Sequence, residues 1–135
     1  MRIATISDIK EISEMLYGMY NEVQPELASK DLTKYYELAE FHLEKDFVYI
    51  DEKNRSVLIM RDITSPVVNK KIYDGVSVYI KPNFRKSKIL SQMYKFMFEN
   101  FDGTIIGYTE FSSEHNDVLI KRHKLMGYVY ELNRS

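Results

Sequence analysis

The stretch that decides the fold is residues 75–90, GVSVYIKPNFRKSKIL. An apolar strand leads into a proline, then a Phe84-Arg85 pair, a basic turn and the start of a helix. A strand that delivers a cationic turn to a helix N-terminus is a common way to hold phosphate, because the unpaired amides and the dipole of the helix both attract anions. The turn contains no glycine, although glycines usually accompany that task. The functional question is therefore whether this turn binds phosphate without the usual glycines.

The bulk composition indicates one folded domain spanning residues 1–135. Hydrophobic residues make up 44% and charged residues 29%, which is ordinary for a globular protein. With 19 basic and 20 acidic residues the net charge is −1, so the sequence makes no general case for a nucleic-acid or membrane partner.

Several classes of site and location are excluded or disfavoured by simple counts. The chain has no cysteine, which excludes disulfides, thiolate nucleophiles and cysteine-based zinc sites. His42 and His115 have no partner at metal-ligand spacing, so we expect no metal site. No signal peptide opens the sequence and no apolar run approaches the ~18 residues of a membrane span, so we expect a cytoplasmic protein.

Periodicity and turn signals predict ten elements in the order β-α-α-β-β-β-α-β-α-β. Strands are predicted over 1–6, 47–50, 57–61, 72–81, 104–111 and 128–132. Helices are predicted from a cap at Ser7, behind Asp31, over 86–101 and over 113–126. The expected inward face of the third helix includes Met93, Met97 and Phe98, and Val76, Val78 and Ile80 are expected to form the buried centre of the sheet. The fold class is therefore α+β, a three-layer α/β/α arrangement with a mixed, mainly antiparallel sheet.

Three local patterns in this order resemble the GNAT superfamily of acetyl-CoA-dependent N-acetyltransferases across the whole chain. The first is MRIAT at 1–5 followed by Ser7-Asp8-Ile9, which is similar to the usual opening of the family. The second is VYIKPNFR at 78–85, which resembles the family's central strand and the turn after it. The third is NDVLIKRHKLMGY at 116–128, which is similar to the family's late helix.

The resemblance implies that residues 85–90 bind the pyrophosphate of CoA. Arg85 matches the first position of the family's loop, whereas Lys88 and Leu90 replace its small residues. Arg85, Lys86, Ser87 and Lys88 are the predicted pyrophosphate ligands, and a bound anion would relieve the ~0.3–1 kcal/mol per charge that a basic first turn costs. An ordinary solvated basic helix start is the alternative explanation.

The remaining candidates follow from the same resemblance. A strand amide near Tyr79 or Ile80 would polarise the thioester carbonyl, and Asn116 would contact the pantetheine arm unless it only caps a helix. Asp74 stands where some members carry a carboxylate base, although Asp74-Gly75 is also a plausible exposed turn. His123 stands where members carry a tyrosine acid, although Lys121, Arg122 and Lys124 also place it in a cationic stretch.

Two functions remain open at this point. The first is transfer of an acetyl group from acetyl-CoA to a primary amine of a small molecule or protein, with the unidentified acceptor lying near residues 18–34. The second is a non-catalytic GNAT-like scaffold that acts through protein contacts, as small bacteriophage proteins of this fold with altered loops do. The family often dimerises through edge strands, so the resemblance also implies a homodimer.

Overall fold

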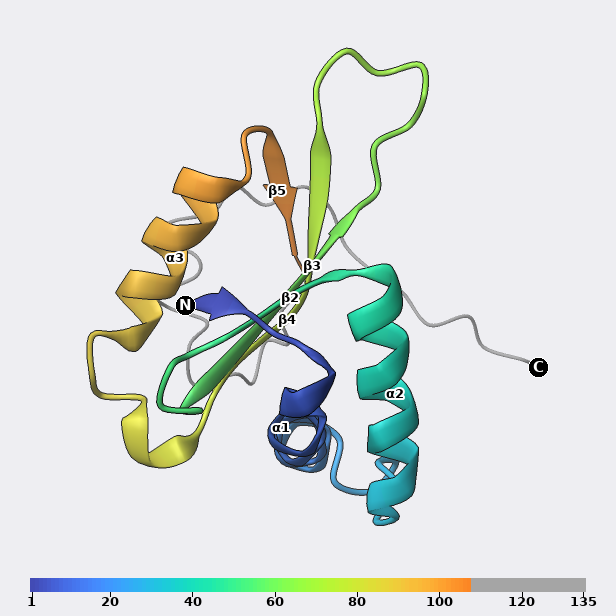
Figure 1. Cartoon of the computed structure of the whole chain (residues 1–135), viewed down its shortest axis with the longest axis vertical. Helices are drawn as coiled ribbons and strands as arrows, with labels where there is room; N and C mark the ends of the chain where they lie inside the picture. The colour runs from blue at the N-terminus through green and yellow to red at the C-terminus, as the bar shows by residue number, and fades with distance from the viewer. Residues whose placement is uncertain (108–135) are drawn as a thin grey trace, which may run out of the picture.

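The computed structural model describes residues 1–107 and shows helices on both faces of one sheet (Figure 1). The sheet has the strand order β1-β2-β3-β4-β5, with β4 and β5 parallel and the other neighbours antiparallel. Its strands are β1 (Arg2–Ile3), β2 (Phe47–Ile50), β3 (Ser56–Asp62), β4 (Ile72–Ile80) and β5 (Thr104–Ile106). The predicted α+β fold with a mixed, mainly antiparallel sheet is confirmed.

Helices α1 (Ile9–Val23) and α2 (Leu32–Lys45) cover one face of the sheet, and α3 (Ile89–Asn100) covers the other (Figure 1). Short 3-10 turns precede α1, at Ile6–Asp8, and α3, at Pro82–Phe84. The described elements agree with the first eight of the predicted order, while the predicted helix at 113–126 and strand at 128–132 lie outside the described residues.

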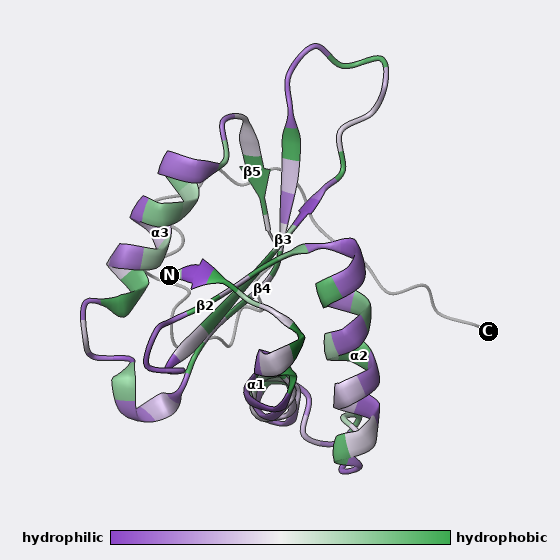
Figure 2. Cartoon of the chain, in the orientation of Figure 1, coloured by the Kyte–Doolittle hydropathy of each residue, from purple (hydrophilic) through white to green (hydrophobic). Residues whose placement is uncertain are grey.

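Two hydrophobic clusters make the core, one on each side of the sheet. The first joins α1 and α2 to the sheet and includes Ile12, Leu16, Ala39, Val57 and Ile59, all fully buried. The second joins α3 to the opposite face. Figure 2 shows the corresponding alternation of hydrophobic and hydrophilic segments along the helices. Such amphipathic helices need a sheet to cover their apolar stripe.

The first strand is shorter than predicted, and the helix after it does not start from a Ser7 cap. Strand β1 ends at Ile3, and a 3-10 turn takes up Ile6. Asp8 organises this corner, because its carboxylate accepts bonds from the Thr5 amide at 2.8 Å and from both Nη atoms of Arg2 at 2.9 and 2.7 Å. The residue that ties the turn is therefore Asp8, and α1 begins directly after it.

A bulge in β4 corrects the prediction that Val76, Val78 and Ile80 form the buried centre of the sheet. Ile59 pairs with Ser77 and Met60 with Gly75, so Val76 is an extra residue in β4. One inserted residue shifts the alternation of side chains to the other face. Val76 therefore packs with the α1/α2 cluster and Ile80 with the α3 cluster, while Val78 is 39% exposed.

Helix α3 starts three residues later than predicted, after the 3-10 turn, and its inward face is rotated. Phe98 was predicted to face inward but is 65% exposed, and Tyr94 is buried in its place. At ~100° per residue, Phe98 lies about 120° around the helix from the midline that Met93 and Met97 define. This rotation places Phe98 at the rim of the contact.

Candidate functional site

Among residues 1–107, the C-terminal half of β4 has a neighbouring strand on its β3 side only, and this unpaired side is called the open edge below. Pairing of β4 with β5 ends at Asp74 opposite Ile106, and in the described part of the chain residues 75–80 pair only with β3. The Lys81 amide donates to Arg55 on the β3 side at 2.9 Å. Because backbone groups alternate along an antiparallel strand, the amides of Val78 and Ile80 point to the open side and that of Tyr79 points to β3.

The direction of the amides distinguishes Tyr79 from Ile80, the two positions at which the sequence predicted a donor to the thioester carbonyl. The Ile80 carbonyl accepts a 2.9 Å bond from Arg85 Nε, as expected for a group that faces away from β3. Within the described part of the chain, the Val78 and Ile80 amides thus face away from β3, as donors to a ligand carbonyl would. Tyr79 contributes its buried ring instead, and burial raises the pKa of its phenol, with the Glu22 carboxylate raising it further.

The turn after β4 exposes its lysines and turns Ile89 and Leu90 inward, whereas Phe84 is 36% exposed. Lys86, Ser87 and Lys88 are exposed, Ile89 is buried, and Leu90 packs against the α3 core cluster. Lys88 occupies the N-cap of α3 without making a side-chain capping bond. The first amides of an α-helix have no intrahelical partner. Of the two bulky residues that stand at the small positions of the predicted loop, Leu90 is turned inward, whereas Lys88 is exposed at the helix start.

The side chain of Arg85 contacts Glu22 and Tyr79 of the same chain. Its two Nη atoms bind the two carboxylate oxygens of Glu22 on α1, with Nη2 to Oε2 at 2.5 Å. The guanidinium also lies 5.5 Å from the centre of the Tyr79 ring. Arg85 is 14% exposed at its side chain, so the predicted first ligand of the loop is an internal ion-pair partner in this structure.

Asp74 lies on the α1/α2 face of the sheet, opposite Arg61 of β3. Its Oδ1 atom is buried and has no hydrogen-bond partner among residues 1–107. Arg61 is held by Asp46 through bonds of 2.7 and 2.9 Å, and Asp46 also contacts His42 Nδ1 at 2.7 Å. The Asp46 hydrogen bond, and secondarily the charge of Asp74, raise the pKa of the Arg61 guanidinium. Asp74 is a strand residue beside a fixed cation, not an exposed turn.

Asn116 and His123 lie outside the described residues. Of the carboxylates near the expected acceptor, Glu22 binds Arg85, and Asp31 caps α2 by accepting from the Thr33 amide at 3.0 Å. Glu26 is exposed.

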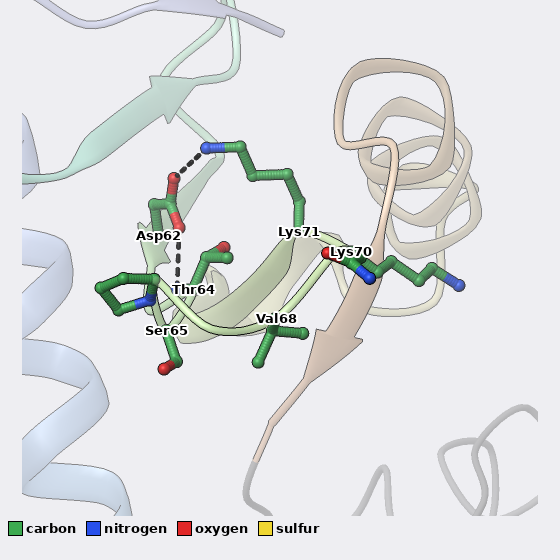
Figure 3. Close-up of a pocket in the computed structure, with 8 residues that line it drawn as sticks. Asp62, Thr64, Ser65, Val68, Lys70 and Lys71 are labelled. Atoms are coloured by element: carbon green, nitrogen blue, oxygen red, sulfur yellow. Dashed lines mark hydrogen bonds and ion pairs between the residues drawn. The ribbon is translucent and has the colours of Figure 1, made fainter.

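A separate hollow of about 560 Å³ lies in the β3–β4 hairpin, at the opposite end of β4 from the basic turn (Figures 1 and 3). Figure 3 shows Lys71 paired with Asp62 across it, at 3.1 Å. No predicted site residue lines this hollow. Among residues 1–107 no cluster of metal-ligating side chains is present, and no described helix is long and apolar enough to cross a membrane.

Sequence reasoning missed the residues that hold the site together. Glu22, Tyr79's ring and the Asp46–Arg61 pair all act through contacts between elements distant in sequence. The Glu22–Arg85 contact spans 63 positions, and no local pattern encodes such a pairing. The sequence signal for this contact was Arg85 after the turn at Pro82, which indicates a positive charge there but does not identify Glu22 as its partner.

Comparison with solved structures supports this fold. A possible acetyltransferase from Clostridium difficile 630 aligns with a TM-score of 0.74 at 16% identity, covering 98% of this chain and 97% of that one. The ribosomal-protein-alanine N-acetyltransferase of Brucella melitensis biovar Abortus 2308 aligns at 0.69 and 12% identity, covering 99% and 97%. A probable acetyltransferase aligns at 0.68 and 16% identity, covering 100% and 99%.

No family model and no curated protein matches the sequence. The structural likeness therefore establishes that the chain has the GNAT-like fold, at sequence identities where the fold alone is shared.

Proposed function

We propose that this protein is an N-acetyltransferase that moves an acetyl group from acetyl-CoA to a primary amine of a small molecule or protein. The observation that carries the proposal is the open edge of β4, where the Val78 and Ile80 amides face away from β3. After a short 3-10 turn, α3 starts beside the exposed Lys86 and Lys88, with the Ile89 amide donating to Ser87 Oγ at 3.4 Å. One strand therefore presents donors for a carbonyl and, at its end, a turn suited to phosphate.

The residues of the turn fit the diphosphate of CoA in two respects. Leu90 packs into the core, which leaves the first amides of α3 uncovered by its side chain. Lys86 and Lys88 are exposed, and their positive charge at the positive end of a helix dipole is unfavourable until an anion is bound. Lys86, Ser87, Lys88 and the helix amides would hold the diphosphate.

Acetyl-CoA supplies an activated acyl group, so few side chains are obligatory for the reaction. The chain's tasks are to orient the two substrates and to remove a proton from the incoming ammonium. Asp74 is proposed as the proton acceptor, because its buried Oδ1 atom has no partner in the described part of the chain and the strand fixes its position. Asn116 and His123 stay predictions as pantetheine ligand and thiolate acid.

An assay of CoA release against a panel of primary amines tests this function. We expect acetyl-CoA-dependent thiol release with at least one amine, and a strong loss of kcat in Asp74→Asn with little change in acetyl-CoA affinity. Asp102→Asn, an exposed carboxylate after α3, is the matched control. Equal rates for Asp74→Asn and the unaltered protein would remove Asp74 from the mechanism.

A non-catalytic scaffold is the second candidate, and one observation favours it. Arg85, the best match to the family's loop, is paired with Glu22 in the protein itself. In a protein that binds no anionic ligand, Arg85 would have no ligand to hold and could serve this internal pair instead. A melting temperature that stays unchanged at saturating acetyl-CoA would favour the scaffold, because a ligand that binds only the folded state must raise it.

A further inference from the structure

The contact between Glu22 and Arg85 joins two parts of the fold that carry different tasks in the proposed reaction. Glu22 lies in the last turn of α1, and Arg85 lies between β4 and α3. Both guanidinium Nη atoms bind the carboxylate, while Nε binds the Ile80 carbonyl at 2.9 Å. The arginine therefore bridges the end of α1 to the last residue of β4.

The surroundings of the pair restrict its movement. The Tyr79 ring lies under the guanidinium, and its hydroxyl reaches α1 so closely that a methyl group added at Gly18 would lie 2.7 Å from it. Arg85 is mostly buried at its side chain, whereas that of Glu22 is 43% exposed. A planar guanidinium held in a bidentate pair and stacked on a ring is well ordered.

We propose that the Glu22–Arg85 pair is a clamp that positions the β4–α3 turn, and that Arg85 is a positioning residue rather than a phosphate ligand. The fork of Arg85 is already occupied by a carboxylate, so the cations that meet the diphosphate are Lys86 and Lys88. The ligand-binding part of this inference rests on the proposed function. The clamp itself does not.

The proposal makes an electrostatically unusual prediction. Removing the negative charge of Glu22 should weaken the binding of a polyanion, because the turn loses its anchor to α1. Simple electrostatics predicts the opposite, since a carboxylate near a phosphate site repels the ligand. If Arg85 were instead a phosphate ligand that Glu22 competes for, Glu22→Gln would also bind the polyanion more tightly.

Hydrogen exchange of the ligand-free protein tests the clamp directly. We expect amides in residues 82–90 to exchange about threefold to tenfold faster in Glu22→Gln and in Arg85→Lys, which keeps the charge but loses the fork. Glu14→Gln, the same change at an exposed position of α1, should leave this segment unchanged. Unchanged exchange in Glu22→Gln would overturn the clamp.

Titration of acetyl-CoA tests the role in binding. We expect Glu22→Gln and Arg85→Gln each to weaken affinity about fivefold to tenfold, and the double variant to be no weaker than either, because both break the same contact. Tighter or equal binding by Glu22→Gln together with weaker binding by Arg85→Gln would overturn the assignment. If the unaltered protein binds no acetyl-CoA, the proposed function fails, and the exchange experiment alone decides the clamp.

Discussion

At the residue scale, Gly18 is a test of how closely α1 meets β4. Alanine in a helix interior normally stabilises by about 1 kcal/mol relative to glycine. At this position the new methyl group would lie 2.7 Å from the Tyr79 hydroxyl, which is buried beneath Arg85. We therefore expect Gly18→Ala to lower the free energy of unfolding, as measured by urea denaturation.

The control is the same substitution in a Tyr79→Phe background. Removing the hydroxyl leaves the nearest ring carbon 3.4 Å from the new methyl group. There Gly18→Ala should recover about 0.5–1 kcal/mol of stabilisation from helix propensity. If Gly18→Ala stabilises both backgrounds equally, the close approach of Tyr79 to α1 is wrong.

Asp8 should make stability depend on acid pH. The Arg2 hydrogen bonds, with the Thr5 amide, lower the pKa of Asp8 to about 2 from its usual 3.8. Because the pKa of Asp8 is lower in the folded than in the unfolded state, the ionised carboxylate stabilises the fold fully above the unfolded-state pKa. That stabilisation is lost as the pH falls toward the folded-state pKa. We expect a contribution on the order of 1–2 kcal/mol, since Arg2 is 43% exposed and partly screened.

Unfolding free energies measured from pH 5 to pH 2 check this, because Asp8→Asn should flatten the fall between about pH 4 and pH 2. Asp102→Asn provides the exposed comparison. An identical pH profile for Asp8→Asn and the unaltered protein would contradict the role of the Arg2 pair.

At the element scale, Asp46 ties the end of α2 to β3. Its side chain is 1% exposed and binds Arg61 and the buried His42. Although desolvation opposes ionisation, the Arg61 and His42 hydrogen bonds lower the pKa of Asp46. Breaking a buried pair leaves its partners uncompensated, so Asp46→Asn should destabilise by about 2–3 kcal/mol, the half-exposed Arg61 softening the loss.

Thermal and urea unfolding measure that effect, with Glu44→Gln as the neighbour whose side chain is 69% exposed. We expect the control to change stability by less than about 0.5 kcal/mol. Equal effects of the two substitutions would mean that Asp46 contributes no more than a surface carboxylate.

The elements themselves could largely be predicted from sequence, because each depends on local periodicity. Strand β2 was predicted with its observed bounds, and α2 starts behind its Asp31 cap as expected. The bulge at Val76 was not predicted; Gly75 within the strand is the local signal that the sequence offers for it, but its position depends on the pairing with β3. The rotation that exposes Phe98 likewise depends on how α3 is seated.

The candidate site was predicted only in part, for the same physical reason. The basic turn and the strand before it follow one another in sequence, so the pattern identified both. The role of Arg85 depends on Glu22, and the surroundings of Asp74 depend on Arg61 and Asp46, all of which come from other elements.

At the scale of the whole molecule, the three layers divide the work of the proposed reaction. In the proposal, the open edge of β4 in the sheet meets the acetyl group, the turn before α3 binds the diphosphate, and α1 contacts that turn through Glu22 and Arg85 (Figure 1). The β3–β4 hairpin projects at the opposite end of β4 and lies apart from this arrangement (Figure 1). Acetyl-CoA would therefore bind at the C-terminal end of β4.

The most direct measurement is isothermal titration of acetyl-CoA into the unaltered protein, into Lys86→Gln/Lys88→Gln and into Lys95→Gln. Lys95 is an exposed cation further along α3. The account predicts one-to-one binding, about tenfold weaker in the double variant and unchanged in Lys95→Gln. Absence of heat with an unmoved melting temperature, or binding that ignores the two turn lysines, would contradict it.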